Sequence, residues 1–291
     1  MIKKIRFRLR QYPLALAAVA IGLYYALSFL LDLPLNLLPE GLGAAALSLT
    51  LSCGLTVALT VALGYGWVFG RKGMGKTLGA GAGLFVPQAL LFLSLYSLAV
   101  EDPNTQWLSR EETLVQLLKL FTVAFWEETV FRGVIANAFG IRYGADGRGV
   151  WRAVILSGLV FGLMHLTNLA YGVPLLSALV QSAVAWVIGM LLAAVYHRGG
   201  CLWATVLIHF VMDAASLFSS SFLGTATDTE VIATLSPANL LPIAVFLPVT
   251  LFVLRPKKMP EALSTLAAHR QLDGFFPERA GAVQEDGEQE P

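Results

Sequence analysis

Residues 125–133 read Phe-Trp-Glu-Glu-Thr-Val-Phe-Arg-Gly, and they place two adjacent carboxylates and an arginine inside an apolar segment that covers about 114–139. An ionisable side chain in the hydrocarbon of a bilayer costs several kcal/mol, so it persists only where a partner or water-filled space receives it. On a helix, Glu128 and Arg132 are four residues apart and can pair. Glu127 is rotated by about 100° from Glu128 and needs a partner on another helix. The stretch therefore predicts a buried polar site inside a helical bundle.

The composition of the whole chain is that of a membrane protein. Of the 291 residues, 56% are hydrophobic and 13% are charged, against roughly 25% charged in soluble domains. Apolar runs of about 18 residues or more recur along the chain, which is typical of spanning helices. A net charge of +1 leaves no basic face for nucleic acid. We therefore expect an all-α, polytopic membrane bundle of about eight transmembrane helices and no nucleic-acid partner.

The apolar runs divide the chain into three parts. Residues 1–12 form a basic N-terminus, and residues 13–254 hold the spans. Residues 255–291 are expected to be a disordered cytoplasmic tail, because the sequence from Pro260 onward is charged and mostly polar. The run from 13 to 31 is too long for the core of a signal peptide, so we interpret it as a retained first helix. The expected spans lie at about 13–31, 43–69, 78–100, 112–140, 152–168, 174–196, 201–219 and 238–254.

Charges in the connections orient these spans. Alternate connections are rich in arginine and lysine, whereas the others are mainly acidic or uncharged. Because cytoplasmic loops carry an excess of basic residues, we expect a multi-pass protein of the cell membrane with both termini in the cytoplasm.

Ionisable residues on three of these spans reach a similar depth. At a rise of about 1.5 Å per residue, Glu127 and His165 each lie about 20 Å from the cytoplasmic ends of their spans. His209 and Asp213 lie about 12 and 18 Å in, and they share one face of their helix. A single histidine on an apolar helix is more often a packed core residue, and a Glu–Arg pair can be purely structural. Coincidence of depth on three spans favours a metal site or a general-base site that activates water.

Three motifs occur in order on these spans. They are Glu-Glu-x-x-x-Arg (Glu127, Glu128, Arg132), Phe-x-x-x-His (Phe161, His165) and His-x-x-x-Asp (His209, Asp213). In this order they resemble the CPBP intramembrane protease family, which contains the CAAX prenyl endopeptidases and the bacteriocin-processing and self-immunity proteins. The resemblance covers roughly 110–220, the expected site-bearing core. It implies a bundle that encloses a conical intramembrane cavity, and an endopeptidase that hydrolyses a peptide bond of a membrane-associated substrate.

The resemblance also implies roles for the motif residues. Glu127 is expected to be the general base that activates water, helped by His165. Glu128 is expected to assist it or to be held by Arg132. His209 and Asp213 of the last motif are expected to stabilise the oxyanion of the tetrahedral intermediate. The expected catalytic residues are therefore Glu127, Glu128, Arg132, His165, His209 and Asp213.

The last motif leaves the chemistry open. An ionised aspartate only accepts hydrogen bonds, so Asp213 serves an oxyanion hole only when protonated; otherwise it orients His209 or binds a metal. If a divalent metal such as zinc is bound, its expected ligands are Glu127, His165, His209 and Asp213. Metal-dependent and metal-independent glutamate mechanisms both remain open at this point. A prenylated substrate is not implied, because the resemblance concerns the site.

Two other functions fit the same residues. A transporter or channel would use Glu127, His165 and His209 as a proton or cation relay, yet the sequence shows no internal repeat of the kind that many transporters carry. A non-catalytic membrane scaffold or immunity protein would keep the fold, but it has no evident need for Glu127 in hydrocarbon. The expected partners are membrane lipid and a peptide or membrane-protein substrate.

Overall fold

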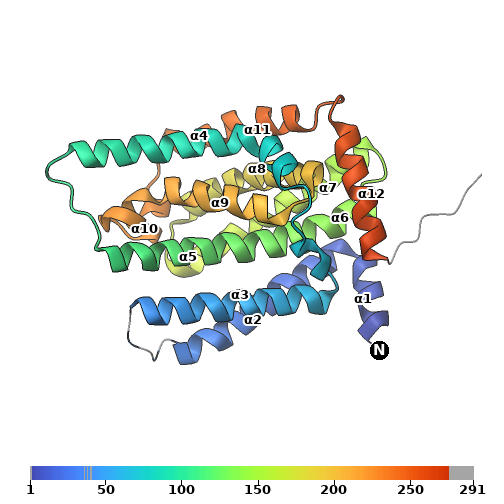
Figure 1. Ribbon diagram of the computed structural model, residues 1–291, viewed down its shortest axis with the longest axis horizontal. Coiled ribbons are helices and arrows are strands. Elements are labelled where there is room, and N and C mark those ends of the chain that lie inside the picture. The colour runs from blue at the N-terminus through green and yellow to red at the C-terminus, as the bar shows by residue number, and fades with distance from the viewer. Residues whose placement is uncertain (1, 36, 38, 40, 275–291) are drawn as a thin grey trace, which may run out of the picture.

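The structure is a computed structural model that describes residues 2–35, 37, 39 and 41–274. Over these residues the regular secondary structure is entirely helical. The long helices run roughly side by side, and two shorter ones, α1 (Ile2–Gln11) and α12 (Met259–Asp273), lie across one end of the bundle (Figure 1). The predicted all-α polytopic membrane bundle is confirmed.

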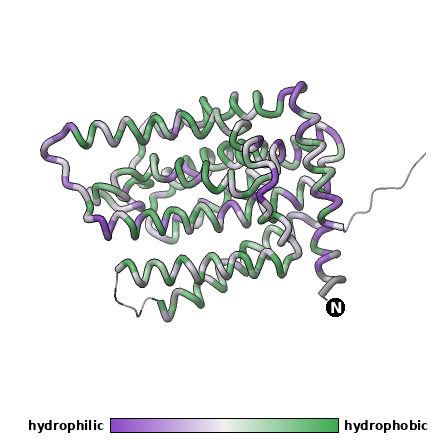
Figure 2. The backbone as a smooth tube through the Cα atoms, viewed as in Figure 1, coloured by the Kyte–Doolittle hydropathy of each residue, from purple (hydrophilic) through white to green (hydrophobic). Residues whose placement is uncertain are grey.

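Five helical stretches in the described part of the chain are long and apolar enough to cross a membrane. They are α2 (Pro13–Leu35), α3 (Leu42–Leu63), α4 (Met74–Glu101), α7 with the 3-10 turn that follows it (Gly147–Tyr171), and α8 (Leu175–Gly199). Two shorter apolar helices, α9 (Leu202–Ser216) and the stretch Pro237–Val253 that contains α11 (Leu241–Val253), fall where the last two spans were expected. Hydrophobic residues cover most of the length of the long helices, and hydrophilic residues gather towards their ends (Figure 2).

The predicted span at 112–140 lies within one long helical run made of three pieces. These are α5 (Arg110–Glu128), a π-helical segment η2 (Thr129–Ala136) and α6 (Asn137–Tyr143). The run begins at a capping box, in which the Ser109 hydroxyl accepts from the Glu112 N–H while the Glu112 carboxylate accepts from the Ser109 N–H. Single-turn π segments inside α-helices are frequent at functional sites, and this one starts directly after Glu128.

The remaining elements are short connections. They are η1 (Gly66–Phe69), η3 (His165–Tyr171), η4 (Ser219–Leu223), α10 (Asp228–Ala233) and η5 (Pro237–Leu240).

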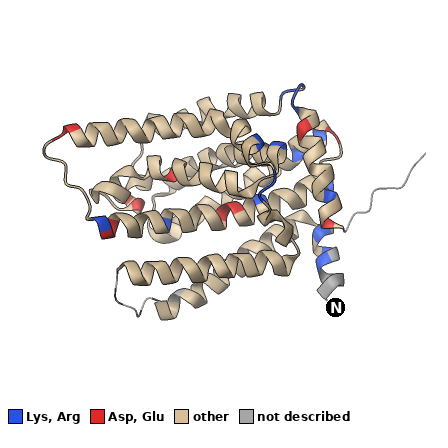
Figure 3. Cartoon of the chain, viewed as in Figure 1, with Lys and Arg blue, Asp and Glu red and all other residues tan. Residues whose placement is uncertain are grey.

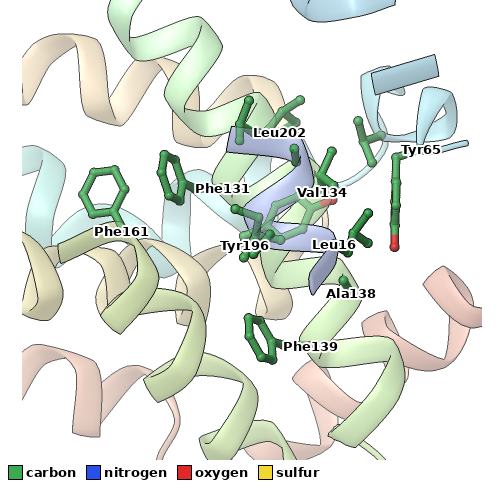
Figure 4. Close-up of a cluster of buried hydrophobic side chains, with 14 of the residues drawn as sticks. Leu16, Tyr65, Phe131, Val134, Ala138, Phe139, Phe161, Tyr196 and Leu202 are labelled. Carbon is green, nitrogen blue, oxygen red and sulfur yellow. The ribbon is translucent and has the colours of Figure 1, made fainter. Parts of the chain in front are cut away.

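The core of the bundle surrounds the π segment. Phe131 and Val134 of η2 are fully buried, together with Phe161 of α7 and Tyr196 of α8 (Figure 4). The rings of Phe131 and Phe161 meet edge to face, with their centroids 4.9 Å apart. The π segment is therefore clamped on several sides by packed side chains, and the polar groups on either side of it are held in place.

The prediction of a disordered tail from residue 255 is wrong for α12. Ala262, Leu266 and His269 are spaced four and three residues apart, so they form one face of the helix, and that face is buried against the bundle. The burial of this narrow stripe outweighs the polar composition of the segment. Residues 275–291 of the predicted tail lie outside the described residues.

The two ends of the described chain meet. Arg10 of α1 and Asp273 of α12 form an ion pair of 2.6 Å, and both side chains are buried. Most of the described lysine and arginine residues also lie at the end of the bundle where α1 and α12 lie (Figure 3).

Candidate active site

The candidate site lies where α5, η2, α7 and α9 approach one another in the interior of the bundle. Glu127 and Glu128 are the last residues of α5, and Arg132 is in η2. His165 follows the last residue of α7, and the final motif is in α9.

Glu128 is the centre of a fully buried charge cluster. Its Oε1 atom lies 3.0 Å from Nη1 of Arg132, as the four-residue spacing predicted. The same oxygen accepts a hydrogen bond of 2.7 Å from Nδ1 of His209. The side chains of Glu128 and Arg132 are 0% and 1% exposed. A buried carboxylate needs a countercharge and hydrogen-bond donors, and this one receives both from two other residues.

The second nitrogen of His209 faces two further carboxylates. Its Nε2 atom lies 3.6 Å from Oε2 of Glu127 and 3.5 Å from Oδ2 of Asp213. The side chains of Glu127 and Asp213 are 12% and 18% exposed, whereas that of His209 is 4% exposed. The partner that Glu127 was expected to find on another helix is therefore His209, and this side of the imidazole is the accessible one.

His165 approaches the cluster from α7. Its Nδ1 donates a hydrogen bond of 2.9 Å to the carbonyl oxygen of Phe161, one helical turn earlier. Because Nδ1 is engaged, Nε2 is the nitrogen left for a ligand or a proton acceptor. His165 interacts electrostatically with His209 and Asp213. All the residues of the three motifs are thus brought to one region.

Phe161 has a contact that its place in the motif did not reveal. The guanidinium carbon of Arg132 lies 4.4 Å from the centroid of the Phe161 ring, in cation–π geometry. The rings of His165 and His209 lie 4.8 and 6.1 Å from the same ring. Phe161 therefore packs against Arg132, His165 and His209 at once and helps to fix their positions.

Tyr25 of α2 was missed by the sequence analysis. Its hydroxyl donates to Sδ of Met164 over 3.3 Å, and it interacts electrostatically with Glu127. The ring of its neighbour Tyr24 stacks on Trp126 at 4.2 Å. Tyr25 belongs to no motif and lies in an apolar run, so no signal in the sequence marks it.

The arrangement does not fit the metal site that was considered. Among the described residues, no group of three or more His, Cys, Asp and Glu side chains is placed to hold a metal ion. Nδ1 of His209 is engaged by Glu128 and Nδ1 of His165 by a backbone carbonyl, so Nε2 is the nitrogen of each ring that is left for the site. The expected zinc ligands Glu127, His165, His209 and Asp213 are thus not arranged around a common metal position.

A cavity of about 840 Å³ lies between α2, α3 and α5. Trp126, next to Glu127 in the sequence, contributes to its lining, but none of the six candidate catalytic residues does. The conical cavity around the site stays a prediction.

The fold and the site together define a helical membrane protein with an acid–imidazole centre inside its bundle. Residues 109–215 match the Rce1-like family model, described as type II CAAX prenyl endopeptidase Rce1-like. This match confirms the resemblance drawn from the motifs, and the matched segment contains all six candidate residues. Over this range the chain is similar to the CAAX-type membrane proteases that the family model describes. No curated protein and no solved structure matches the chain.

Proposed function

We propose that this protein is an intramembrane endopeptidase that hydrolyses a peptide bond of a membrane-associated substrate with a glutamate-activated water. One observation carries the proposal. Two adjacent carboxylates approach opposite nitrogens of a single imidazole, with Glu128 sealed inside the protein and Glu127 on the accessible side. The sealed carboxylate orients the ring, and the accessible one is free to exchange a proton with water.

In the proposed reaction, Glu127 takes a proton from water as the oxygen adds to the carbonyl carbon of the peptide bond. The carbonyl oxygen becomes an oxyanion, and Glu127 then delivers the proton to the amide nitrogen as the C–N bond breaks. His165, through its free Nε2, holds the water beside Glu127. In these reaction steps the proton that Glu127 takes from water is the one that it gives to the leaving amine, so no metal is needed to balance the reaction.

His209 is proposed to stabilise the oxyanion. Because Nδ1 donates to Glu128, Nε2 faces the reacting centre, and as an N–H group it donates to the developing negative charge. Loss of one such donor typically costs about 2.7–4 kcal/mol of barrier. Asp213, 3.5 Å from Nε2, is proposed to position this N–H rather than to contact the oxyanion itself.

We further propose that the protein lies in the cell membrane with both termini in the cytoplasm. Two observations support this orientation. The helices α1 and α12 share one end of the bundle, and most of the described lysine and arginine residues lie there (Figure 3).

The test replaces Glu127 by Gln in cells and compares the peptides of their membranes with those of wild-type cells. Glu101→Gln, at the end of α4, is the matched control because it makes the same chemical change outside the site. We expect cleavage products to disappear only in Glu127→Gln, at unchanged protein level. Persistent cleavage in that variant contradicts the proposal. Altered proton or ion flux would instead indicate a transporter, and an unchanged phenotype a scaffold. A chelator in the same comparison tests the metal-free mechanism.

A further inference from the structure

The helix α12 packs against several glycines of the bundle. A Cβ atom at Gly140 of α6, or at Gly144 directly after α6, would lie 2.5 or 2.6 Å from the side chain of Leu266. A Cβ at Gly200 would lie 3.3 Å from Nε2 of His269, and the left-handed φ of +81° there also favours glycine. Three glycines, two of them four residues apart and the third on another part of the chain, thus let α12 approach the bundle closely.

A polar chain runs from α12 into the interior. Nδ1 of His269 donates to Oδ1 of Asn137 over 2.8 Å. The amide nitrogen of Asn137 donates in turn to the carbonyl oxygens of Arg132 (3.2 Å) and Gly133 (2.9 Å), and to the hydroxyl of Tyr196 (2.9 Å). Asn137 is fully buried and His269 nearly so. A buried polar group that loses its hydrogen-bond partner destabilises the protein. These hydrogen bonds therefore hold His269, Asn137 and the η2 backbone in fixed positions relative to one another.

This series of hydrogen bonds ends on the backbone of η2, the segment that carries Arg132 of the candidate site. Arg132 and Gly133 belong to η2, in which the wider π turn alters the normal helical hydrogen-bond register. Arg132 pairs with Glu128, and Glu128 orients His209. A second contact reinforces the docking, because Nε of Arg270 donates to the carbonyl of Ile141 over 3.1 Å. Movement of α12 would therefore be transmitted to the geometry around the imidazole.

We propose that α12, which lies outside the segment matched by the family model, is a positioning element of the active site. His269 acts through Asn137 to hold the π segment, and hence Arg132 and Glu128, in the arrangement that orients His209. His269 is a positioning residue and touches no reacting atom. The catalytic consequence rests on the proposed function, whereas the structural linkage does not.

The test uses the full chain in lipid nanodiscs and measures hydrogen exchange of the peptides that cover 129–136. In His269→Ala we expect the exchange rate of residues 129–136 to rise about fivefold to tenfold. The variant lacks a buried hydrogen bond that stabilises the closed form of this segment against local unfolding. The matched control is Leu272→Ala on the exposed side of α12, which should leave exchange unchanged. His269→Gln, which keeps an N–H donor, should restore much of the protection.

Asn137→Ala breaks the same chain from the other side and leaves the contacts of Leu266 and Arg270 in place. The two changes should be non-additive, because each removes the same connection. Unchanged exchange at 129–136 in both variants, or fully additive effects, would overturn the proposal. Cleavage of the membrane peptides that disappear in Glu127→Gln should fall in His269→Ala and recover in His269→Gln. If wild-type protein cleaves nothing, the proposed function fails, and the exchange measurements still decide the linkage.

Discussion

Glu128 and His209, separated by 81 positions in the sequence, are joined by a hydrogen bond of 2.7 Å in a place that solvent does not reach. The same carboxylate oxygen lies 3.0 Å from Arg132. One buried oxygen therefore serves two purposes: it neutralises the guanidinium and selects the orientation of the imidazole. This separates the two adjacent glutamates, of which one is part of the framework and the other faces the accessible side.

First, we expect the same Glu→Gln change to lower the stability of the protein by different amounts at Glu128 and at Glu127. Glu128→Gln leaves the Arg132 guanidinium buried without its carboxylate, which costs about 3–5 kcal/mol when one partner of a buried pair is removed. Glu127→Gln should cost clearly less, because the Glu127 side chain is partly exposed and is not the ion-pair partner of Arg132. Thermal unfolding of both variants in the same detergent checks this. A double change, Glu128→Leu with Arg132→Met, should recover stability without activity. Equal losses in the two single variants would contradict the assignment.

The second prediction concerns the ring beneath the arginine. Phe161→Leu removes the cation–π contact with Arg132, worth about 0.5–2 kcal/mol, in addition to the loss of packing that any buried Phe→Leu change causes. Phe131→Leu is the control, since Phe131 is equally buried and makes no such contact with Arg132. Chemical unfolding should show the larger loss for Phe161→Leu. Cleavage should also fall more in that variant, because both histidine rings pack against Phe161. Identical behaviour of the two variants would show that the cation–π contact is unimportant.

The sequence predicts what short-range spacing determines. Glu128 with Arg132, and His209 with Asp213, are four residues apart on helices, so their mutual approach follows from helix geometry. Equal depth along the spans was enough to expect Glu127 near a histidine of another helix. It could not tell which nitrogen of His209 each carboxylate would face, because that depends on how the helices rotate against one another.

Other features depend on contacts that no local pattern carries. The π geometry of 129–136 is a departure from the regular helix that residue propensities do not encode, and it is stabilised here by the Asn137 amide and by packing. The docking of α12 had a weak signal, the spacing of Ala262, Leu266 and His269, which the charged residues around it concealed. Tyr25 reaches the site only because α2 packs there.

The third prediction tests the close approach of α7 and α8. A Cβ atom at Gly158 would lie 2.7 Å from the backbone nitrogen of Met190 and 2.9 Å from the carbonyl of Trp186. Because backbone atoms cannot swing aside as a side chain does, Gly158→Ala should force the helices apart and cost about 1–3 kcal/mol. Gly79→Ala in α4 is the control, since a Cβ there meets nothing within 4 Å. Unfolding midpoints of the two variants give the comparison, and a neutral Gly158→Ala would refute the contact.

The fourth prediction is a pH dependence of the docking of α12. Burial lowers the pKa of His269 to about 4, from an ordinary value of 6.5. Undocked α12 therefore binds a proton between pH 6.5 and 4 that docked α12 does not, so docking is complete above 6.5 and weakens as the pH falls. The loss amounts to about 3 kcal/mol by pH 4. Hydrogen bonding to Lys258 and Arg198 lowers the pKa of Glu261 to about 2, so its contribution is lost only below about 4.5.

Hydrogen exchange of the peptides that cover 259–273, corrected for the intrinsic pH dependence of exchange, measures this docking. Protection should decline from pH 6.5 downward in the wild type. In His269→Gln, which does not titrate in this range, the decline should be smaller, and what remains comes from Glu261 and from His197 of α8, which is buried beside α12 and interacts electrostatically with position 269 in the wild type. The direction of the effect is the test. Because the pKa of His269 is lower in docked than in undocked α12, lowering the pH should undock the helix, and raising the pH should not. A decline of the same size in His269→Gln would assign the effect to another group, and weaker protection at higher pH would show that His269 is docked in its charged form.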